Sequence, residues 1–161
     1  RGVRRISVQS ANDMLTAVQS QVAGAHIFIA AAAVADWRVA HASAHKIKKD
    51  GSGKPPALEF AENPDILATV AASAAAQNGA LYCVGFAAES ENLAAHAKAK
   101  RERKGVPLLV GNIGPDTFGQ DDNALLLVDA QGSREIPRAS KRVLAQQLVA
   151  EIALRLQTAQ E

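Results

Sequence analysis

Short, unbroken apolar runs recur along the chain and predict strands that are buried on both faces of a sheet. The runs are His26–Ala31, Leu81–Phe86 and Leu108–Val110. Strands that are apolar on both faces are typical of parallel sheets covered by helices. The pattern therefore predicts a mainly parallel sheet at the centre of the molecule.

Segments with helical signals fall between these runs. Ser10, followed three residues later by Asp13, predicts a helix start, and Gly24 its end. Asn63-Pro64-Asp65 predicts another, with Asn63 as the cap and Pro64 in the first helical position. That helix should continue through the Ala-rich stretch to Asn78-Gly79. Two more helices are predicted over Glu91–Lys104, closed by Gly105, and over Ser140–Gln157.

The remaining segments complete the expected fold. We expect short strands at Arg5–Val8 and Leu58–Phe60, and a hairpin of Asn123–Val128 with Arg134–Ile136. Residues 32–44 and the basic, glycine-bearing stretch Lys46–Pro56 are expected as loops. Because strands and helices alternate, the prediction is an α/β, Rossmann-like three-layer fold, with a C-terminal β-hairpin and helix, in a single domain over residues 1–161.

Composition narrows the class of protein. The 161 residues carry a formal net charge of +2, too small to indicate wholesale nucleic-acid or membrane binding. The single cysteine, Cys83, excludes an intramolecular disulfide and a multi-cysteine zinc site, and we expect it to be a buried, inert thiol. No apolar run is long enough to span a membrane, and no signal peptide is present, so a cytoplasmic location is expected. Because the chain does not start with Met, we interpret it as an internal part of a longer protein.

Candidate chemistry should lie beyond the carboxyl ends of the strands, where open α/β sheets bind ligands. The segments in this position are Ala30–Asp36, Phe86–Glu89 and Gly111–Asp116. Asp36 follows a run of small residues that would let a ligand approach the backbone, although Asp is also common in turns. Phe86 is either a core residue or a ring that stacks on a base.

Two basic segments each allow two interpretations. Lys46–Lys49, followed by a Gly-containing loop, is either a solvated surface loop or a flap that folds over a polyanion. The cations that end the helix at Lys104 either respond to the helix dipole or bind phosphate through Lys100 and Lys104, which share one helix face. No aromatic residues interleave with the lysines, which disfavours nucleic-acid binding. Glycine fingerprints for dinucleotides and P-loops are absent, and the histidines lack metal-ligand spacing.

Several motifs occur in a characteristic order: Ala31-Ala32-Ala33-Val34-Ala35-Asp36-Trp37, Lys46-Ile47-Lys48-Lys49, Glu62-Asn63-Pro64-Asp65-Ile66, Val84-Gly85-Phe86-Ala87-Ala88-Glu89 and Lys100 to Lys104. Taken together, they resemble the CTP-dependent phosphopantothenate–cysteine ligase domain of bacterial coenzyme A biosynthesis. The resemblance continues through Val110-Gly111-Asn112, Phe118 and Asp122-Asn123-Ala124, with Gly111 where the family pattern has Ala, and it covers nearly the whole chain.

The resemblance implies an enzyme that couples 4′-phosphopantothenate to L-cysteine. CTP, assisted by Mg²⁺, would activate the carboxylate as an acyl-cytidylate, and the cysteine amine would displace CMP. The family domain is commonly a homodimer fused to a flavin-dependent decarboxylase, so FMN belongs to a half that is not part of this chain.

The resemblance also assigns roles to individual residues. Lys46 would be the catalytic lysine of the flap and approach the phosphates, Lys100 and Lys104 would hold the nucleotide from the other side, and Asn112 would bind substrate. The expected nucleotide-binding set is Ala30, Asp36, Lys46, Ala61, Glu62, Asn63, Pro64, Phe86, Lys100 and Lys104.

Three alternatives stay open. The family pattern places a further strand and a glycine-rich segment upstream of this sequence, so the chain could be a nucleotide-binding or dimerisation module without turnover. It could also be another α/β nucleotide-dependent enzyme, such as a dinucleotide-dependent reductase. A nucleic-acid role is the least favoured of the three.

Overall fold

The computed structural model describes residues 2–43, 45–49, 51, 53–89, 92–113 and 119–158. Its main sheet has five strands in the order β1-β4-β5-β6-β7, and a separate pair joins β2 to β3. The strands are β1 Ile27–Ala30, β2 Trp37–Val39, β3 Phe60–Glu62, β4 Tyr82–Glu89, β5 Leu108–Ile113, β6 Asp122–Val128 and β7 Ser133–Ser140; the helices are α1 Ala11–Val22, α2 Ile66–Ala71, α3 Ala74–Gln77, α4 Leu93–Lys104 and α5 Lys141–Thr158.

The sheet combines a parallel part and an antiparallel hairpin. β1 pairs parallel with β4, with Ile27 opposite Tyr82, and β4 pairs parallel with β5, with Val84 opposite Leu108. β6 and β7 continue the sheet as antiparallel strands. This arrangement confirms the predicted Rossmann-like α/β fold with its C-terminal hairpin and helix.

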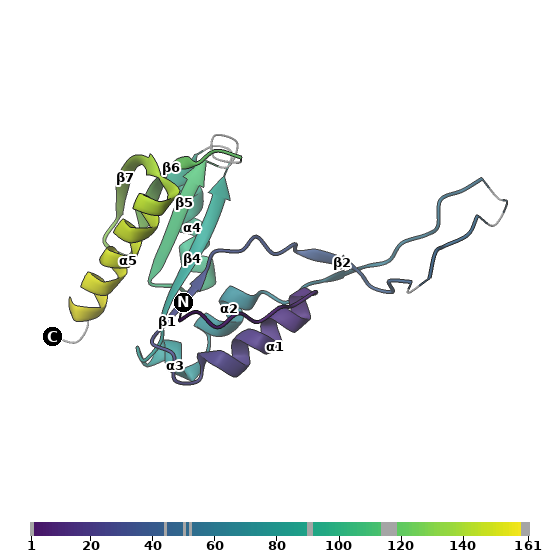
Figure 1. Ribbon diagram of the computed structural model, residues 1–161, viewed down its shortest axis with the longest axis horizontal. Helices are drawn as coiled ribbons and strands as arrows, with labels where there is room; N and C mark the ends of the chain where they lie inside the picture. Colours follow the sequence, from purple (N-terminus) through teal and green to yellow (C-terminus); the bar gives the residue numbers. More distant parts are fainter. Residues whose placement is uncertain are drawn as a thin grey trace.

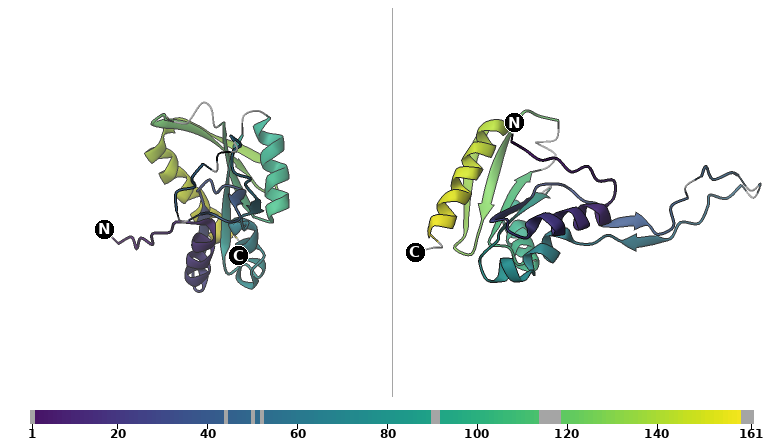
Figure 2. Two further views of the ribbon diagram at one scale, coloured as in Figure 1. Left: turned by 90° about the vertical axis from the view of Figure 1, so that its right-hand side faces the viewer. Right: turned by 60° about the horizontal axis from the view of Figure 1, so that its bottom comes forward.

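Helices cover both faces of the sheet (Figures 1 and 2). On one face, α1, α2 and α4 pack over a cluster that includes Leu67, Val70, Ala97 and Leu109. On the other face, α5 packs its buried residues Leu144, Leu148 and Ile152 against β5, β6 and β7. Burial of apolar side chains on both faces explains why the β4 and β5 sequences lack strand-like alternation.

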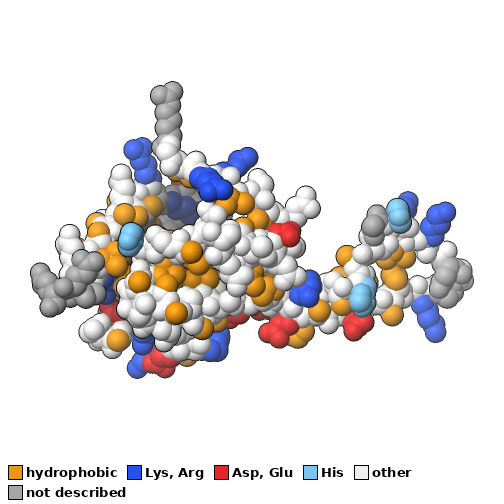
Figure 3. Space-filling view, turned by 90° about the horizontal axis from the view of Figure 1, so that it is seen from below, with side chains coloured by type: hydrophobic (Ala, Val, Ile, Leu, Met, Phe, Trp, Pro, Cys, Tyr) orange, Lys and Arg blue, Asp and Glu red, His pale blue; other side chains and the backbone are white. Residues whose placement is uncertain are grey.

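β2 and β3 form the root of a long arm that projects from the body (Figure 1). The two strands pair antiparallel, with Trp37 opposite Glu62 and Val39 opposite Phe60. The described residues between them form the outer part of the arm, and Lys and Arg side chains gather at its end (Figure 3). The prediction of a loop over residues 32–44 was wrong at β2, because a three-residue strand has too little pattern to show in the sequence.

Several expected element boundaries were also wrong. Arg5–Val8 is not a strand; the segment has no sheet partner among the described residues, and Arg4 instead donates to Gln21 of α1 at 3.2 Å. The end of α1 is as predicted, because Gly24 follows the C-cap Ala23 with a positive φ of 86°. The helix expected up to Asn78 is two helices, because the hydroxyl of Ser73 caps α3 as a new start. The predicted α4 residue Glu91 lies outside the described residues, as do Asp116 and Phe118.

Candidate functional site

Asn63 connects two segments at the root of the arm by hydrogen bonds. Its backbone N–H donates to the Asp36 carbonyl at 2.7 Å, and its side-chain amide donates to the Ala35 carbonyl at 2.8 Å. The side chain therefore bridges the segment after β1 and the segment after β3, which lie 28 positions apart in the sequence. This double attachment holds the backbone of Asp36 beside the start of α2.

Arg38 orients the Asn63 amide. One guanidinium nitrogen donates to the Glu62 carbonyl and lies 3.3 Å from the Asn63 side-chain oxygen. Because this oxygen faces Arg38, the predicted role of Asn63 as the helix cap was wrong. The cap is Asp65, whose carboxylate accepts from the Ala68 N–H at 3.0 Å.

Asp65 also forms an ion pair with Lys104 at the end of α4. The Lys104 side chain is 19% exposed, so its ammonium is held close to the protein surface. Burial alone would raise the pKa of the Asp65 carboxyl, but the hydrogen bonds from Lys104 and Ala68 and the nearby positive charges lower it overall. The pair fixes the end of α4 next to the Asn63-Pro64 segment.

The structure thus brings together one group of the predicted residues at the arm root: Asp36, Glu62, Asn63, Pro64 and Lys104. Ala61 lies opposite Arg38 in the β2–β3 ladder. Lys100 is half-buried, one turn before Lys104 on α4, and Ala30 ends β1 opposite Gly85. Together, Arg38, Lys100 and Lys104 supply positive charge beside polar backbone, a combination that suits a phosphorylated ligand.

Other predicted residues lie elsewhere. The ring of Phe86 packs into the α5-side cluster, whereas Asn63 and Lys104 adjoin the elements that cover the opposite face. Lys46 is exposed in the outer part of the arm, which extends away from the body (Figure 1). Asn112 is half-buried near the carboxyl end of β5, opposite Ala88. The structure does not bring these three side chains to the arm root.

Sequence reasoning missed the roles of Arg38 and Asp65. Asp65 carried a signal, because an Asp one residue after Pro in a helix-start motif is a strong cap candidate in its own right. The sequence held no signal for the role of Arg38, since only the pairing of β2 with β3 brings Arg38 to Asn63.

The described residues contain no group of three His, Cys, Asp or Glu side chains that could hold a metal ion. Cys83 is buried in β4, and burial raises the pKa of its thiol, as expected for an inert cysteine. Of the helices in the described part of the chain, none has the length and apolar character needed to cross a bilayer.

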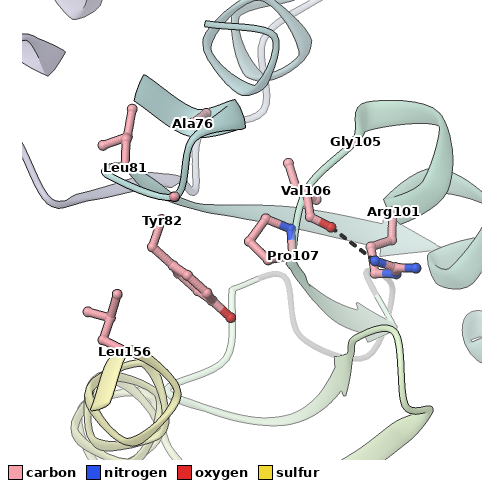
Figure 4. Close-up of a pocket in the computed structure, with 9 residues that line it drawn as sticks. Ala76, Leu81, Tyr82, Arg101, Gly105, Val106, Pro107 and Leu156 are labelled. Atoms are coloured by element: carbon pink, nitrogen blue, oxygen red, sulfur yellow. Dashed lines mark hydrogen bonds between the residues drawn. The ribbon is translucent and has the colours of Figure 1, made fainter. Parts of the chain in front are cut away.

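A hollow of about 420 Å³ lies beside the last turn of α4 (Figure 4). Tyr82, Arg101, Pro107 and Leu156 line it, at the amino ends of β4 and β5. Burial raises the pKa of the Tyr82 phenol, and Arg101 donates to the Val106 carbonyl at 3.2 Å. Gly105, the residue after Lys104, also lines it, so this hollow adjoins the end of α4 that contributes to the arm-root group.

Comparison with known proteins decides the family. The model of the DNA/pantothenate metabolism flavoprotein C-terminal domain family matches residues 1–156. The chain belongs to this family. The sequence of this chain is 38% identical to the coenzyme A biosynthesis bifunctional protein CoaBC of Vibrio vulnificus strain CMCP6 over 153 residues. It is 40% identical to the CoaBC protein of Escherichia coli strain K12 over 157 residues. These two matches cover 93% and 95% of this chain, but only 37% and 38% of the length of the two relatives.

Solved structures share the fold. The crystal structure of the C-terminal domain of CoaBC superimposes with a TM-score of 0.74 at 25% identity, covering 95% of this chain and 66% of that one. A Cab2 mutant in complex with phosphopantothenate-cysteine has a TM-score of 0.72 at 18% identity, covering 94% and 52%. These matches confirm the Rossmann-like fold of this family member.

Proposed function

We propose that the chain carries the CTP-dependent ligation of 4′-phosphopantothenate with L-cysteine in coenzyme A biosynthesis. In the first step, the pantothenate carboxylate attacks the α-phosphate of CTP, which forms an acyl-cytidylate and releases pyrophosphate. In the second step, the cysteine amine attacks the acyl carbon, which forms the amide bond and releases CMP. The protein would work in the cytoplasm, next to the fused FMN-dependent decarboxylase that the family resemblance implies.

The observation that carries this proposal is the arm-root group. Asp36, Glu62 and Asn63, which the family resemblance assigns to the nucleotide, meet there through hydrogen bonds, and the ion pair of Lys104 with Asp65 brings the end of α4 to the same segment. A chain that merely needed a helix start would not require Asn63 to bind the two neighbouring carbonyls of Ala35 and Asp36. The relatives' names, which place them in coenzyme A biosynthesis, favour the same substrate class.

Positive charge at this group would offset the charge of the triphosphate and the attacking carboxylate. Lys100 and Lys104 on α4, with Arg38 at the arm root, provide it. Mg²⁺ would arrive with the triphosphate and be held mainly by phosphate oxygens and water, because the described residues form no three-ligand cluster and Mg²⁺ usually binds in this way.

The arm would supply the flap and the dimer contact. Trp37, Val39 and Phe60 lie on one face of the β2–β3 ribbon, and Trp37 and Phe60 are 61% and 59% exposed. An isolated two-stranded ribbon is marginally stable, so an exposed apolar face of this kind favours packing on a second copy of the chain. Lys46, farther out, would then approach phosphates when the loop closes and excludes water from the acyl-cytidylate.

Pyrophosphate release from CTP tests the proposal. The full-length protein should release pyrophosphate only when phosphopantothenate is present, and faster with CTP than with ATP. Lys46→Ala and Lys104→Ala should each lower kcat/KM by about tenfold or more, because each removes a charge-assisted phosphate contact. Lys49→Ala is the matched control in the same loop and should stay within about twofold. Equal losses in all three variants, or release that needs no phosphopantothenate, would contradict the assignment.

A second candidate is a nucleotide-binding and dimerisation module without turnover. It is favoured by β1, which is an edge strand of the main sheet with Ile27 and Ile29 41% and 40% exposed. Apolar side chains on an open parallel edge indicate that further structure completes the sheet. Comparing this 161-residue chain with the full-length protein by calorimetry and by pyrophosphate release distinguishes the two: CTP binding without turnover in both proteins selects the module.

A further inference from the structure

The two carboxylate oxygens of Asp65 accept hydrogen bonds from two different elements. Oδ1 accepts from the Ala68 N–H at 3.0 Å and caps α2, whereas Oδ2 pairs with the Lys104 ammonium 39 positions away. One side chain therefore ties the start of α2 to the last turn of α4. Lys104 ends α4, and Asn63 and Pro64 of the arm-root group come just before α2.

Lys104 needs such a tie because its side chain has a flexible four-carbon stem. An unrestrained lysine loses rotamer freedom when it binds a phosphate, and this loss weakens binding. In the structure, the ion pair already holds the Lys104 ammonium at Asp65, the residue after Pro64, so the Lys104 side chain is ordered on folding. The helix dipole adds to this, since the C-terminal end of α4 also favours a cation.

We propose that Asp65 is a positioning residue for the ligase: it fixes the Lys104 ammonium at the edge of the nucleotide site while it caps the helix that follows Asn63-Pro64. The proposal rests on the proposed function, because it assumes that Lys104 meets the nucleotide. Asp65 itself would not contact CTP; it acts through Lys104.

Asp129 offers a matched control, because it is built in the same way on another pair of elements, the turn between β6 and β7 and helix α5. One oxygen accepts from the N–H groups of Gln131 and Gly132 at 2.9 and 3.1 Å, and the other pairs with Arg155 at 2.5 Å. Asp129→Asn therefore removes the same charge from a similar ion pair, on elements that contribute no residue to the arm-root group.

The test measures pyrophosphate release by the full-length protein at varied CTP concentrations. Asp65→Asn keeps an oxygen that can cap α2 but loses the charge that holds Lys104. We expect KM for CTP to rise about fivefold with kcat within about twofold, whereas Asp129→Asn leaves both unchanged. In a Lys104→Met background, Asp65→Asn should raise KM no further, because the residue through which it acts is gone. Asp65→Ala should lower the unfolding temperature more than Asp65→Asn, yet raise KM equally.

An unchanged or lowered KM for CTP in Asp65→Asn overturns the proposal, since a lowered value would mean that Asp65 competes with the nucleotide for Lys104. Additive effects of Asp65→Asn and Lys104→Met also overturn it. If the unaltered protein releases no pyrophosphate from CTP, the proposed function itself fails, and the positioning role with it. Failure confined to the variants removes the positioning role alone.

Discussion

At the scale of single residues, two glycines let helices lie close to the sheet. A Cβ atom on Gly85 would lie 2.6 Å from a methyl of Leu67 and 2.8 Å from a methyl of Leu109. Both leucines are buried in the core, Leu67 on α2 and Leu109 on β5. A Cβ atom on Gly111 would lie 2.9 Å from a methyl of Leu93, and no other residue would come as close. Leu93 is half-buried at the start of α4. The two sites therefore differ in how easily the surroundings can shift.

Gly85→Ala should lower the free energy of unfolding by about 1–3 kcal/mol, because two packed leucines must move. Gly111→Ala should change it by less than about 1 kcal/mol, since one half-buried leucine can adjust, in keeping with the Ala that the family pattern has there. Urea unfolding followed by circular dichroism measures both. A larger loss for Gly111→Ala than for Gly85→Ala would contradict this account of the packing.

At the scale of elements, the arm has few hydrogen bonds of its own to stabilise it. Its strands have three residues each, and beyond them the Ala40 N–H donates to the Glu59 carbonyl at 2.8 Å. The apolar ribbon face that contains Trp37 and Phe60 has no partner element in the main sheet. Contact with a second copy would stabilise this face by burying it.

Trp37→Ser should therefore weaken self-association by at least about tenfold, because an exposed aromatic side chain is a typical interface anchor. Val149→Ser on α5 is the control: Val149 is 60% exposed but lies outside the arm. Sedimentation velocity over a range of concentrations measures the dimer dissociation constant of each variant. A parent protein that is monomeric throughout, or equal weakening by both substitutions, would refute the role of the arm.

The sequence predicted the elements whose patterns are long or chemically distinct. Ser10 caps α1 in a capping box, and Gly105 ends α4 with a positive φ of 64°, as their residue types indicated. Asn63 was misassigned because its side chain bonds across the arm root, a contact that depends on tertiary structure. The ring of Phe86 could not be placed from sequence either, because a strand buried on both faces gives no sign of which face a side chain occupies.

At the scale of the whole molecule, ion pairs join distant elements and link stability to pH. Burial alone would raise the pKa of the Asp129 carboxyl, but its hydrogen bond from Arg155 and those from the turn N–H groups lower it below 3.8. The pKa of the Asp65 carboxyl is lowered in the same way by the hydrogen bonds from Lys104 and Ala68. A carboxyl whose pKa is lower in the folded state stabilises the fold above its unfolded value near 3.8 and loses that contribution as the pH falls through the folded value.

The free energy of unfolding should accordingly decrease between about pH 5 and about pH 2, and Asp129→Asn should flatten this decrease relative to the parent. The variant should be less stable than the parent at about pH 7, and the difference should narrow as acid protonates Asp129 in the parent. Urea titrations at several pH values provide the measurement. A constant difference between the two proteins across this range would mean that the Asp129 charge does not contribute.

The central claim is that this chain belongs to an enzyme that joins a phosphorylated acid to cysteine through a cytidylate. Incubating the full-length protein with CTP, Mg²⁺, 4′-phosphopantothenate and L-cysteine, and quantifying products by mass spectrometry, tests it directly. We expect phosphopantothenoyl-cysteine, CMP and pyrophosphate in equal amounts, with no product when CTP is omitted. Formation of CDP and inorganic phosphate, or amide product without CTP, would contradict the account.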